Sequence, residues 1–100
     1  MSLRQFEGRV AAITGAGSGI GRALAEELAR RGTHLALSDV DDAGLAETVS
    51  RCEGAGSGIK VTAAHVDVAD RAAGHALADR VVAEHGAVHL VVNNAGVALG

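Results

Sequence analysis

Four glycines fall within residues 15–21, directly after an apolar run at residues 10–13. The stretch that follows has helical periodicity, because Ile20, Leu24 and Leu28 recur every four residues. Its charged residues fall on the other side: Arg22, Glu26, Glu27, Arg30 and Arg31. The pattern predicts a strand, a glycine turn and an amphipathic helix with one face in a core and the other in water.

Such a turn is suited to binding a phosphate, although a flexible loop without a ligand is the alternative. Glycines let the backbone approach a ligand, and the first N–H groups of the helix and the helix dipole meet an anion there. A P-loop is disfavoured because no Gly-Lys-Ser/Thr ending follows. The usual G-x-G-x-x-G fingerprint is also absent, since Ile20 and Arg22 occupy the positions of its third glycine. The hydroxyl and N–H group of Ser18 are placed to reach a phosphate oxygen.

Asp39 follows a second short apolar run, residues 34–38, about 20 residues after the glycine turn. An acid at the end of the second strand accepts hydrogen bonds from the adenosine ribose in dinucleotide-binding proteins. Its charge would repel the 2′-phosphate of NADP, and residues 40–43 contain no Arg or Lys to receive one. We therefore expect NAD rather than NADP. Helix capping is the alternative for Asp39 and the preferred interpretation for Asp41 and Asp42.

The rest of the sequence predicts further strands and helices in alternation. Helices are expected at residues 43–51 and from the cap Asp70 to Gly86, strands at residues 60–66 and 88–92, and a connector at residues 54–58. This order implies a Rossmann-like, doubly wound α/β fold whose parallel sheet has strand order 3-2-1-4 and helices on both faces. Strands one and four are then neighbours, so residues 14–15 and 93–96 should meet at the switch point where such sheets bind ligands.

Composition narrows the classes of function. The 48% of hydrophobic residues suffice for a core, and the net charge of −3 gives no reason to expect a nucleic-acid partner. No signal-peptide run and no stretch of about 20 apolar residues occurs, so a soluble cytoplasmic protein without a membrane partner is expected. Cys52, the only cysteine, is interpreted as a helix residue and the five scattered histidines as structural. No Cys/His spacing suggests a metal.

Three segments resemble motifs of the classical short-chain dehydrogenases/reductases. Residues 14–21 match T-G-x-x-x-G-I-G, residues 67–70 match D-V-x-D, and residues 93–96 match N-N-A-G. In that family the first acid of D-V-x-D and its neighbour lie against the adenine ring, and N-N-A-G supports the sheet and contacts a ribose of the cofactor. With the turn and the acid after strand two, the resemblance implies this cofactor site: Gly15, Ser18, Gly19, Ile20, Gly21, Asp39, Asp67, Val68, Asn94, Ala95 and Gly96.

The resemblance also implies an NAD-dependent oxidoreductase that moves a hydride between its cofactor and an alcohol or carbonyl. The family's catalytic Ser, Tyr and Lys belong to later segments, so no residue here is identified as catalytic. Residues 1–100 are accordingly expected to be the N-terminal part of one Rossmann domain, inactive alone and part of a homo-oligomer in the complete enzyme. Residues 88–92 would then form an exposed apolar edge, and the isolated segment would associate.

Two other functions stay open on the sequence. A short chain that lacks the catalytic side chains could be a non-catalytic nucleotide-binding or interaction module. Residues 15–19 also read as G-x-G-x-G, which together with an acid after the second strand allows a methyltransferase that binds S-adenosylmethionine. Residues 93–96 have no place in that enzyme class, which makes the methyltransferase the remoter alternative.

Overall fold

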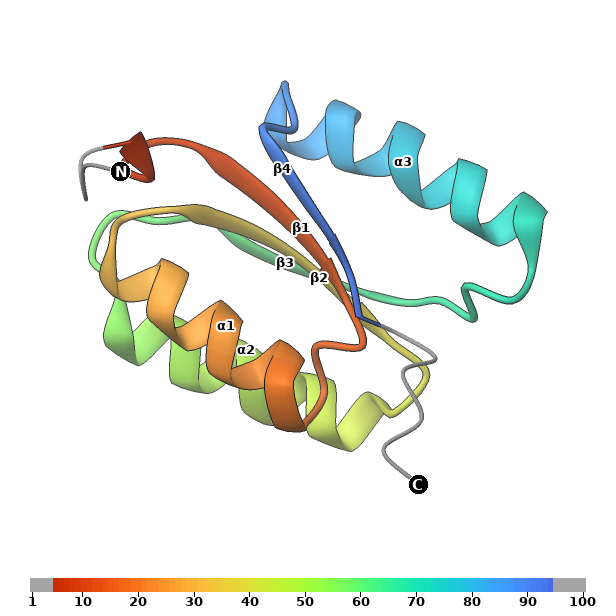
Figure 1. Cartoon of the computed structure of the whole chain (residues 1–100), viewed down its shortest axis with the longest axis horizontal. Coiled ribbons are helices and arrows are strands. Elements are labelled where there is room, and N and C mark those ends of the chain that lie inside the picture. Colours follow the sequence, from red (N-terminus) through yellow and green to blue (C-terminus); the bar gives the residue numbers. More distant parts are fainter. Residues whose placement is uncertain (1–4, 95–100) are drawn as a thin grey trace.

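A computed structural model describes residues 5–94. These residues form a parallel sheet of four strands in the order β3-β2-β1-β4. In chain order the elements are β1 (Val10–Thr14), α1 (Gly19–Arg30), β2 (His34–Asp39), α2 (Asp42–Ala55), β3 (Val61–His65), α3 (Arg71–His85) and β4 (Leu90–Asn93). Figure 1 shows α1 and α2 on one face of the sheet and α3 over the other. The predicted Rossmann-like fold and its strand order are confirmed.

The main core lies between the sheet and helices α1 and α2. Ile13 of β1 and Leu35 and Leu37 of β2 are at most 1% exposed, and burying a side chain of this size contributes about 1.5–3 kcal/mol. None of the helices in residues 5–94 is long and apolar enough to cross a membrane.

Helix α1 presents a different face to the sheet from the one that its periodicity predicts. Its buried residues are Gly21, Ala25, Leu28 and Ala29, whereas Ile20 is 58% exposed. Gly21, Ala25 and Ala29 are spaced by four, so they form a stripe of small side chains that lets the helix backbone approach the sheet. The expectation that Ile20 faces the core is therefore wrong, while that for Leu28 is confirmed.

Helix α2 is longer than predicted and ends at Ala55 instead of residue 51. Thr48 and Cys52 lie in its buried stripe, which continues toward the last turns. Burial of this stripe offsets the cost of Gly54, which lies in the last turn and costs up to about 1 kcal/mol relative to alanine. Tertiary packing thus carries the helix into the segment that glycine content marks as a connector.

Aspartates cap α2 and α3, as predicted. Oδ1 of Asp41 accepts a hydrogen bond from the Gly44 N–H group (3.0 Å), and Oδ1 of Asp70 accepts from two N–H groups in the first turn of α3 (3.0 and 3.3 Å). A cap of this kind contributes about 1 kcal/mol. Asp42, the other predicted capping residue, instead lies inside the first turn of α2 and pairs with His65 at 2.7 Å.

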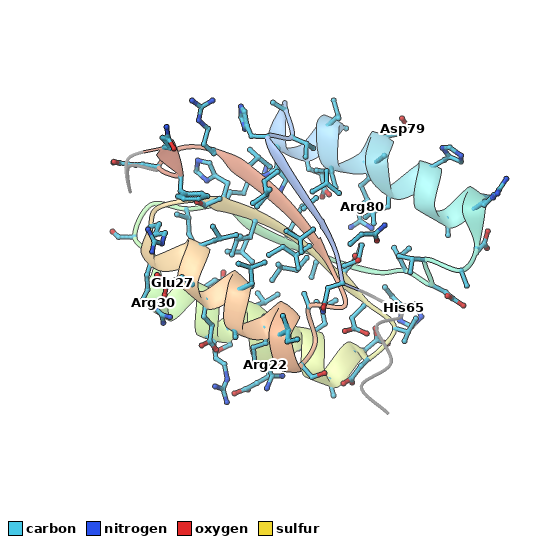
Figure 2. The ribbon with its side chains drawn as sticks, in the orientation of Figure 1. Arg22, Glu27, Arg30, His65, Asp79 and Arg80 are labelled. Carbon is cyan, nitrogen blue, oxygen red and sulfur yellow. The ribbon has the colours of Figure 1, made fainter. Side chains whose placement is uncertain are left out.

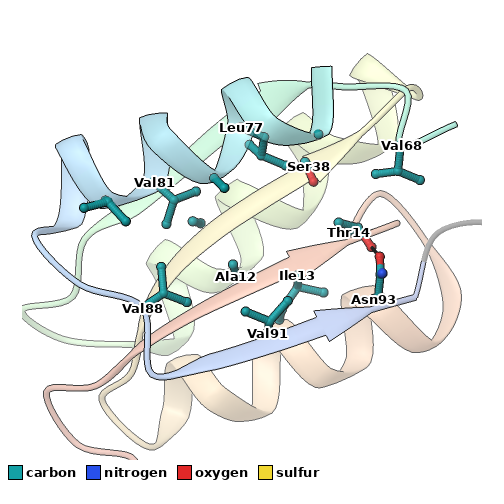
Figure 3. A pocket seen from close by; sticks show the side chains of 14 residues that line it. Ala12, Ile13, Thr14, Ser38, Val68, Leu77, Val81, Val88, Val91 and Asn93 are labelled. Carbon is teal, nitrogen blue, oxygen red and sulfur yellow. Dashed lines mark hydrogen bonds between the residues drawn. The ribbon is translucent and has the colours of Figure 1, made fainter. Parts of the chain in front are cut away.

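The face of the sheet under α3 is loosely covered. A cavity of about 450 Å³ lies between α3 and strands β1, β2 and β4, and its lining is mostly apolar (Figure 3). Within α3, Val81 alone is buried.

At the edge of the sheet, Val91 of β4 is 67% exposed. The predicted exposed apolar edge of the fourth strand is confirmed.

Candidate functional site

Hydrogen bonds from side chains join the ends of β1 and β4. The Thr14 hydroxyl donates to Oδ1 of Asn93 (3.1 Å) and accepts from the N–H group of Asn94 (3.0 Å). The side-chain amide of Asn94 donates to the carbonyl oxygen of Gly15 (3.2 Å). Thr14 and Asn94 are 80 positions apart in the sequence, so the predicted meeting of these two segments at the switch point is confirmed.

Gly21 lets α1 begin directly against this junction. A Cβ atom at this position would overlap the carbonyl oxygen of Gly15 and lie 2.8 Å from Nδ2 of Asn94. Gly15 and Gly19 have φ angles of 65° and 56°, a left-handed conformation that glycine adopts without steric penalty. The geometry of the turn therefore depends on these glycines, which argues against the flexible-loop alternative.

The N-terminus of α1 differs from the N-termini of α2 and α3. Ser18 occupies the N-cap position, but its side chain makes no capping hydrogen bond, whereas the N-cap side chains of α2 and α3 do. The first turn of α1 contains no acidic residue, as in α3. Ser18, Gly19 and Ile20 are all exposed. Because the first N–H groups of a helix have no partner within it, this exposed end can donate hydrogen bonds to an anion such as phosphate.

Asp39, at the end of β2, lies beside the glycine turn. Its Oδ2 accepts a hydrogen bond from the N–H group of Gly17 (2.7 Å), and its Oδ1 accepts from those of Val40 (2.7 Å) and Asp41 (3.1 Å). Since Asp41 caps α2, the alternative of Asp39 as a helix cap is wrong. The structure places Asp39 next to the turn, as a ribose acceptor requires. Its bond to Gly17 was not predicted from the sequence.

Asp67 and Val68 follow β3 at the same end of the sheet. Asp67 accepts a hydrogen bond at Oδ1 from the N–H group two residues later, and its carbonyl accepts from the N–H group of Asp70, both at 3.0 Å. Val68 is half-buried and lines the cavity under α3 together with Thr14 (Figure 3). Two of the predicted site residues lie outside the described part of the chain: Ala95 and Gly96.

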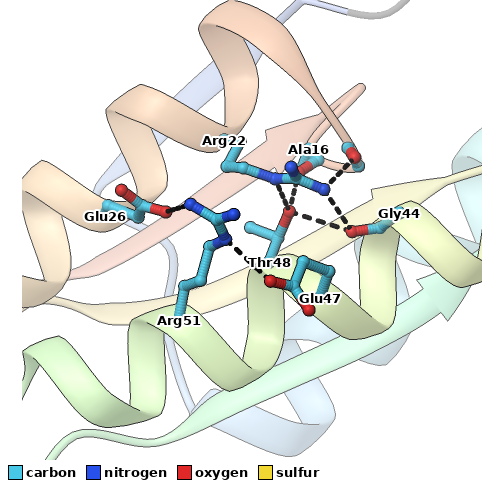
Figure 4. A network of polar contacts seen from close by, with 8 residues as sticks. Ala16, Arg22, Glu26, Gly44, Glu47, Thr48 and Arg51 are labelled. Atoms are coloured by element: carbon cyan, nitrogen blue, oxygen red, sulfur yellow. Dashed lines mark hydrogen bonds and ion pairs between the residues drawn. The ribbon is translucent and has the colours of Figure 1, made fainter.

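Arg22, which periodicity places on the water face of α1, reaches across to α2 (Figures 2 and 4). Its Nη2 donates to the carbonyl oxygens of Gly17 (2.7 Å) and Gly44 (3.0 Å), and its Nε donates to the Thr48 hydroxyl (2.9 Å). The expectation for Arg22 is wrong because periodicity sorts residues by polarity and does not register carbonyls of a neighbouring turn. The sequence offers one signal for this contact: Thr48 places a hydroxyl at the spacing of the apolar stripe of α2.

Cys52 and two of the histidines lie in structural rather than catalytic environments. Burial, together with the nearby Glu26, raises the pKa of the Cys52 thiol to about 11, which makes it a poor nucleophile. His34 and His89 each accept a backbone hydrogen bond at Nδ1 (2.9 Å), which confirms a structural role for these two histidines. Within residues 5–94, no group of three or more His, Cys, Asp or Glu side chains could hold a metal ion.

Known proteins are similar to this chain in sequence and in fold. The family model described as short chain dehydrogenase matches residues 9–100. SadH of Mycobacterium tuberculosis, named as an oxidoreductase, is 55% identical over 96 residues, which make up 96% of this chain and 34% of that protein. The chain therefore spans about a third of the length of this curated relative.

Solved structures are also similar to the chain, among them the following two. A short chain dehydrogenase/reductase from Burkholderia phymatum in complex with NAD matches with a TM-score of 0.79 and 48% identity, over 86% of this chain and 30% of that one. The hydroxysteroid dehydrogenase from Escherichia coli matches with a TM-score of 0.85 and 34% identity, over 94% of this chain and 37% of that one.

Proposed function

The chain belongs to the short chain dehydrogenase family, and on this premise we propose that it forms the dinucleotide-binding half of an NAD-dependent oxidoreductase. The complete enzyme moves a hydride between its cofactor and a small-molecule alcohol or carbonyl. Residues 1–100 are the N-terminal part of its Rossmann domain, and the complete enzyme is a homo-oligomer. This chain contains no tyrosine, so the family's tyrosine-dependent proton transfer is assigned to the remainder of the protein.

The observation that carries the proposal is the convergence of three strand ends on one glycine turn. β1 leads into the turn, β2 brings Asp39 to it, and β4 brings Asn94. The uncapped N-terminus of α1 completes a site with one anion-binding end and one carboxylate, which matches a pyrophosphate linked to a ribose. The proposed contacts are those expected from the sequence: Gly15, Ser18, Gly19, Ile20, Gly21, Asp39, Asp67, Val68, Asn94, Ala95 and Gly96.

NAD supplies the hydride acceptor when it is bound, and this chain's residues hold and orient it. The carboxylate of Asp39 has about four acceptor positions on its two oxygens. Three backbone N–H groups use part of this capacity, from Gly17, Val40 and Asp41. The remainder is available to a hydroxyl of the adenosine ribose, while the N–H groups at the start of α1 receive the pyrophosphate.

Charge supports NAD over NADP as the cofactor. A 2′-phosphate on the same ribose would approach the carboxylate of Asp39, and residues 40–43 offer no Arg or Lys to neutralise it. Arg22 directs its Nε and Nη2 donors to uncharged oxygens of this chain. The site as a whole therefore offers a ribose acceptor without a cation dedicated to a phosphate.

The test is nucleotide binding by the full-length protein, with Asp39→Ala and the matched control Asp42→Ala. Both substitutions remove one negative charge, but Asp42 is exposed and pairs with His65. We expect the wild type to bind NAD more tightly than NADP. Asp39→Ala should reduce that ratio by roughly ten- to a hundredfold, because a hydrogen bond to a charged group contributes about 1.5–3 kcal/mol.

The ratio of NAD affinity to NADP affinity is the informative quantity, since loosening the turn would weaken the binding of both nucleotides together. An unchanged NAD-to-NADP ratio in Asp39→Ala would contradict the role given to that carboxylate. Binding of S-adenosylmethionine in place of both nucleotides would favour the methyltransferase alternative. Binding of NAD without turnover of any alcohol or carbonyl by the full-length protein would favour a non-catalytic module.

A further inference from the structure

Two side chains outside the glycine turn hold its carbonyl groups. The Thr48 hydroxyl on α2 donates to the carbonyl oxygen of Ala16 (2.7 Å), and Arg22 Nη2 donates to that of Gly17 (2.7 Å). Arg22 Nε in turn donates to the Thr48 hydroxyl (2.9 Å), so the two residues form one connected unit (Figure 4). We refer to Arg22 and Thr48 together as the loop clamp.

The N–H groups of the same two loop residues are also bonded within the chain. Ala16 N–H donates to the carbonyl oxygen of Ser38 (3.0 Å), and Gly17 N–H donates to Oδ2 of Asp39 (2.7 Å). Every peptide hydrogen-bonding group of Ala16 and Gly17 therefore has a partner on β2, α1 or α2. These groups belong to three successive peptide planes, 15–16, 16–17 and 17–18, and each plane is held by at least one hydrogen bond just before the exposed end of α1.

The clamp is built from buried or well-anchored groups. Thr48 is completely buried, and two carbonyl oxygens lie within hydrogen-bonding distance of its hydroxyl, that of Ala16 (2.7 Å) and that of Gly44 (3.1 Å). The Arg22 guanidinium also donates to the carbonyl oxygen of Gly44 (3.0 Å), which ties the turn to the first turns of α2. All three hydrogen bonds of Arg22 go to uncharged oxygens, two peptide carbonyls and one hydroxyl, which use the several donors of its planar guanidinium.

We propose that Arg22 and Thr48 are positioning residues that keep the glycine turn in its cofactor-binding conformation. This inference rests on the function proposed above. The apparent affinity of a ligand falls in proportion to the fraction of the protein that is in the binding-competent state. Because the clamp holds carbonyls of the turn, its loss lowers that fraction for any nucleotide that occupies the site.

The test uses the full-length protein and two pairs of variants. Thr48→Val keeps the shape of the side chain and removes the hydroxyl, whereas Thr48→Ser keeps the hydroxyl. Arg22→Met keeps an unbranched aliphatic side chain and removes all donors, whereas Arg22→Lys keeps the charge but lacks the planar guanidinium with its several donors. Arg30→Met is the control, because Arg30 is exposed on the same helix and pairs with Glu27 only on the surface.

Dissociation constants for NAD, NADP and ADP-ribose are measured for each variant, with kcat and KM for NAD where a substrate is known. We expect Thr48→Val and Arg22→Met to bind all three about tenfold more weakly, with a raised KM and an unchanged kcat, since a tenfold drop in the competent fraction gives a tenfold drop in affinity. Thr48→Ser should restore wild-type binding, and Arg30→Met should leave it unchanged.

Amide hydrogen exchange of residues 15–18 in the ligand-free protein gives a readout that does not depend on any nucleotide. Faster exchange there in Thr48→Val and Arg22→Met, but not in Arg30→Met, is the expected result. If the wild type binds NAD and Thr48→Val and Arg22→Met bind it with unchanged affinity, the positioning role of the clamp is overturned and the proposed function stands. This holds even if the thermal stability of the variants falls. A loss confined to NADP in Arg22→Met would also overturn it, because Arg22 would then be a phosphate ligand. Failure of the wild type to bind any of the three would overturn the proposed function and, with it, the cofactor role of the clamp.

Discussion

Replacing Gly21 by alanine measures how closely α1 lies against the end of β1. The new Cβ atom would overlap the carbonyl oxygen of Gly15 and lie 2.9 Å from its carbonyl carbon. These are backbone atoms that cannot rotate away, so α1 must shift. Overpacking of this kind costs about 1–3 kcal/mol. Alanine regains up to about 1 kcal/mol through its helix propensity, so the net loss of stability is about 0–2 kcal/mol.

Gly74→Ala provides the matched control. Gly74 also lies in the first turn of a helix, α3, but a Cβ atom there would have no heavy atom within 4 Å. The propensity gain is common to both variants, so the difference between them isolates the steric cost of about 1–3 kcal/mol. Thermal unfolding of the full-length protein should place Gly21→Ala below Gly74→Ala by about 2–4 °C for each kcal/mol.

NAD titration of the same variants completes the experiment. A shift of α1 moves Gly15 and the N–H groups at the helix start, so Gly21→Ala should bind NAD more weakly while Gly74→Ala binds it normally. Equal melting temperatures for the two variants would refute the close approach of α1 to Gly15. Normal NAD binding by a destabilised Gly21→Ala would separate the packing of the turn from its proposed role.

Three further predictions concern groups outside the site. The Cys52 thiol, with its pKa raised to about 11 by burial, should resist a thiol reagent in the native protein and react after denaturation; rapid native labelling that Cys52→Ser abolishes would contradict this. Burial and the nearby Lys60 lower the pKa of His85 from its ordinary 6.5, so the unfolded chain takes up the proton first as the pH falls. Unfolding free energy should therefore decline below about pH 6.5 more in wild type than in His85→Gln, and the opposite trend would refute the burial argument. Residues 1–100 expressed alone should associate through the edge where Val91 is exposed, and a monomer in sedimentation at micromolar concentration would exclude this.

The sequence predicted the elements of the site because its signals are local. An acid before a helix and apolar residues at a fixed period each depend on a few neighbouring positions, and the caps Asp41 and Asp70 followed from them. The handedness of the strand-helix-strand connections then placed Thr14 beside Asn94, although the two are 80 positions apart. The sequence was thus sufficient to predict the fold and the meeting of the two segments at its switch point.

Tertiary structure decided which face of each helix is used and which backbone groups need partners. Periodicity assigned Ile20 to the core and Arg22 to water, whereas the small stripe of α1 turned Ile20 outward and brought Arg22 over the glycine turn. The bond from Gly17 to Asp39 and the bond from Thr48 to the turn join residues 22 to 32 positions apart. Such contacts depend on how closely two elements approach each other, and that distance is set by the packing of all of them together.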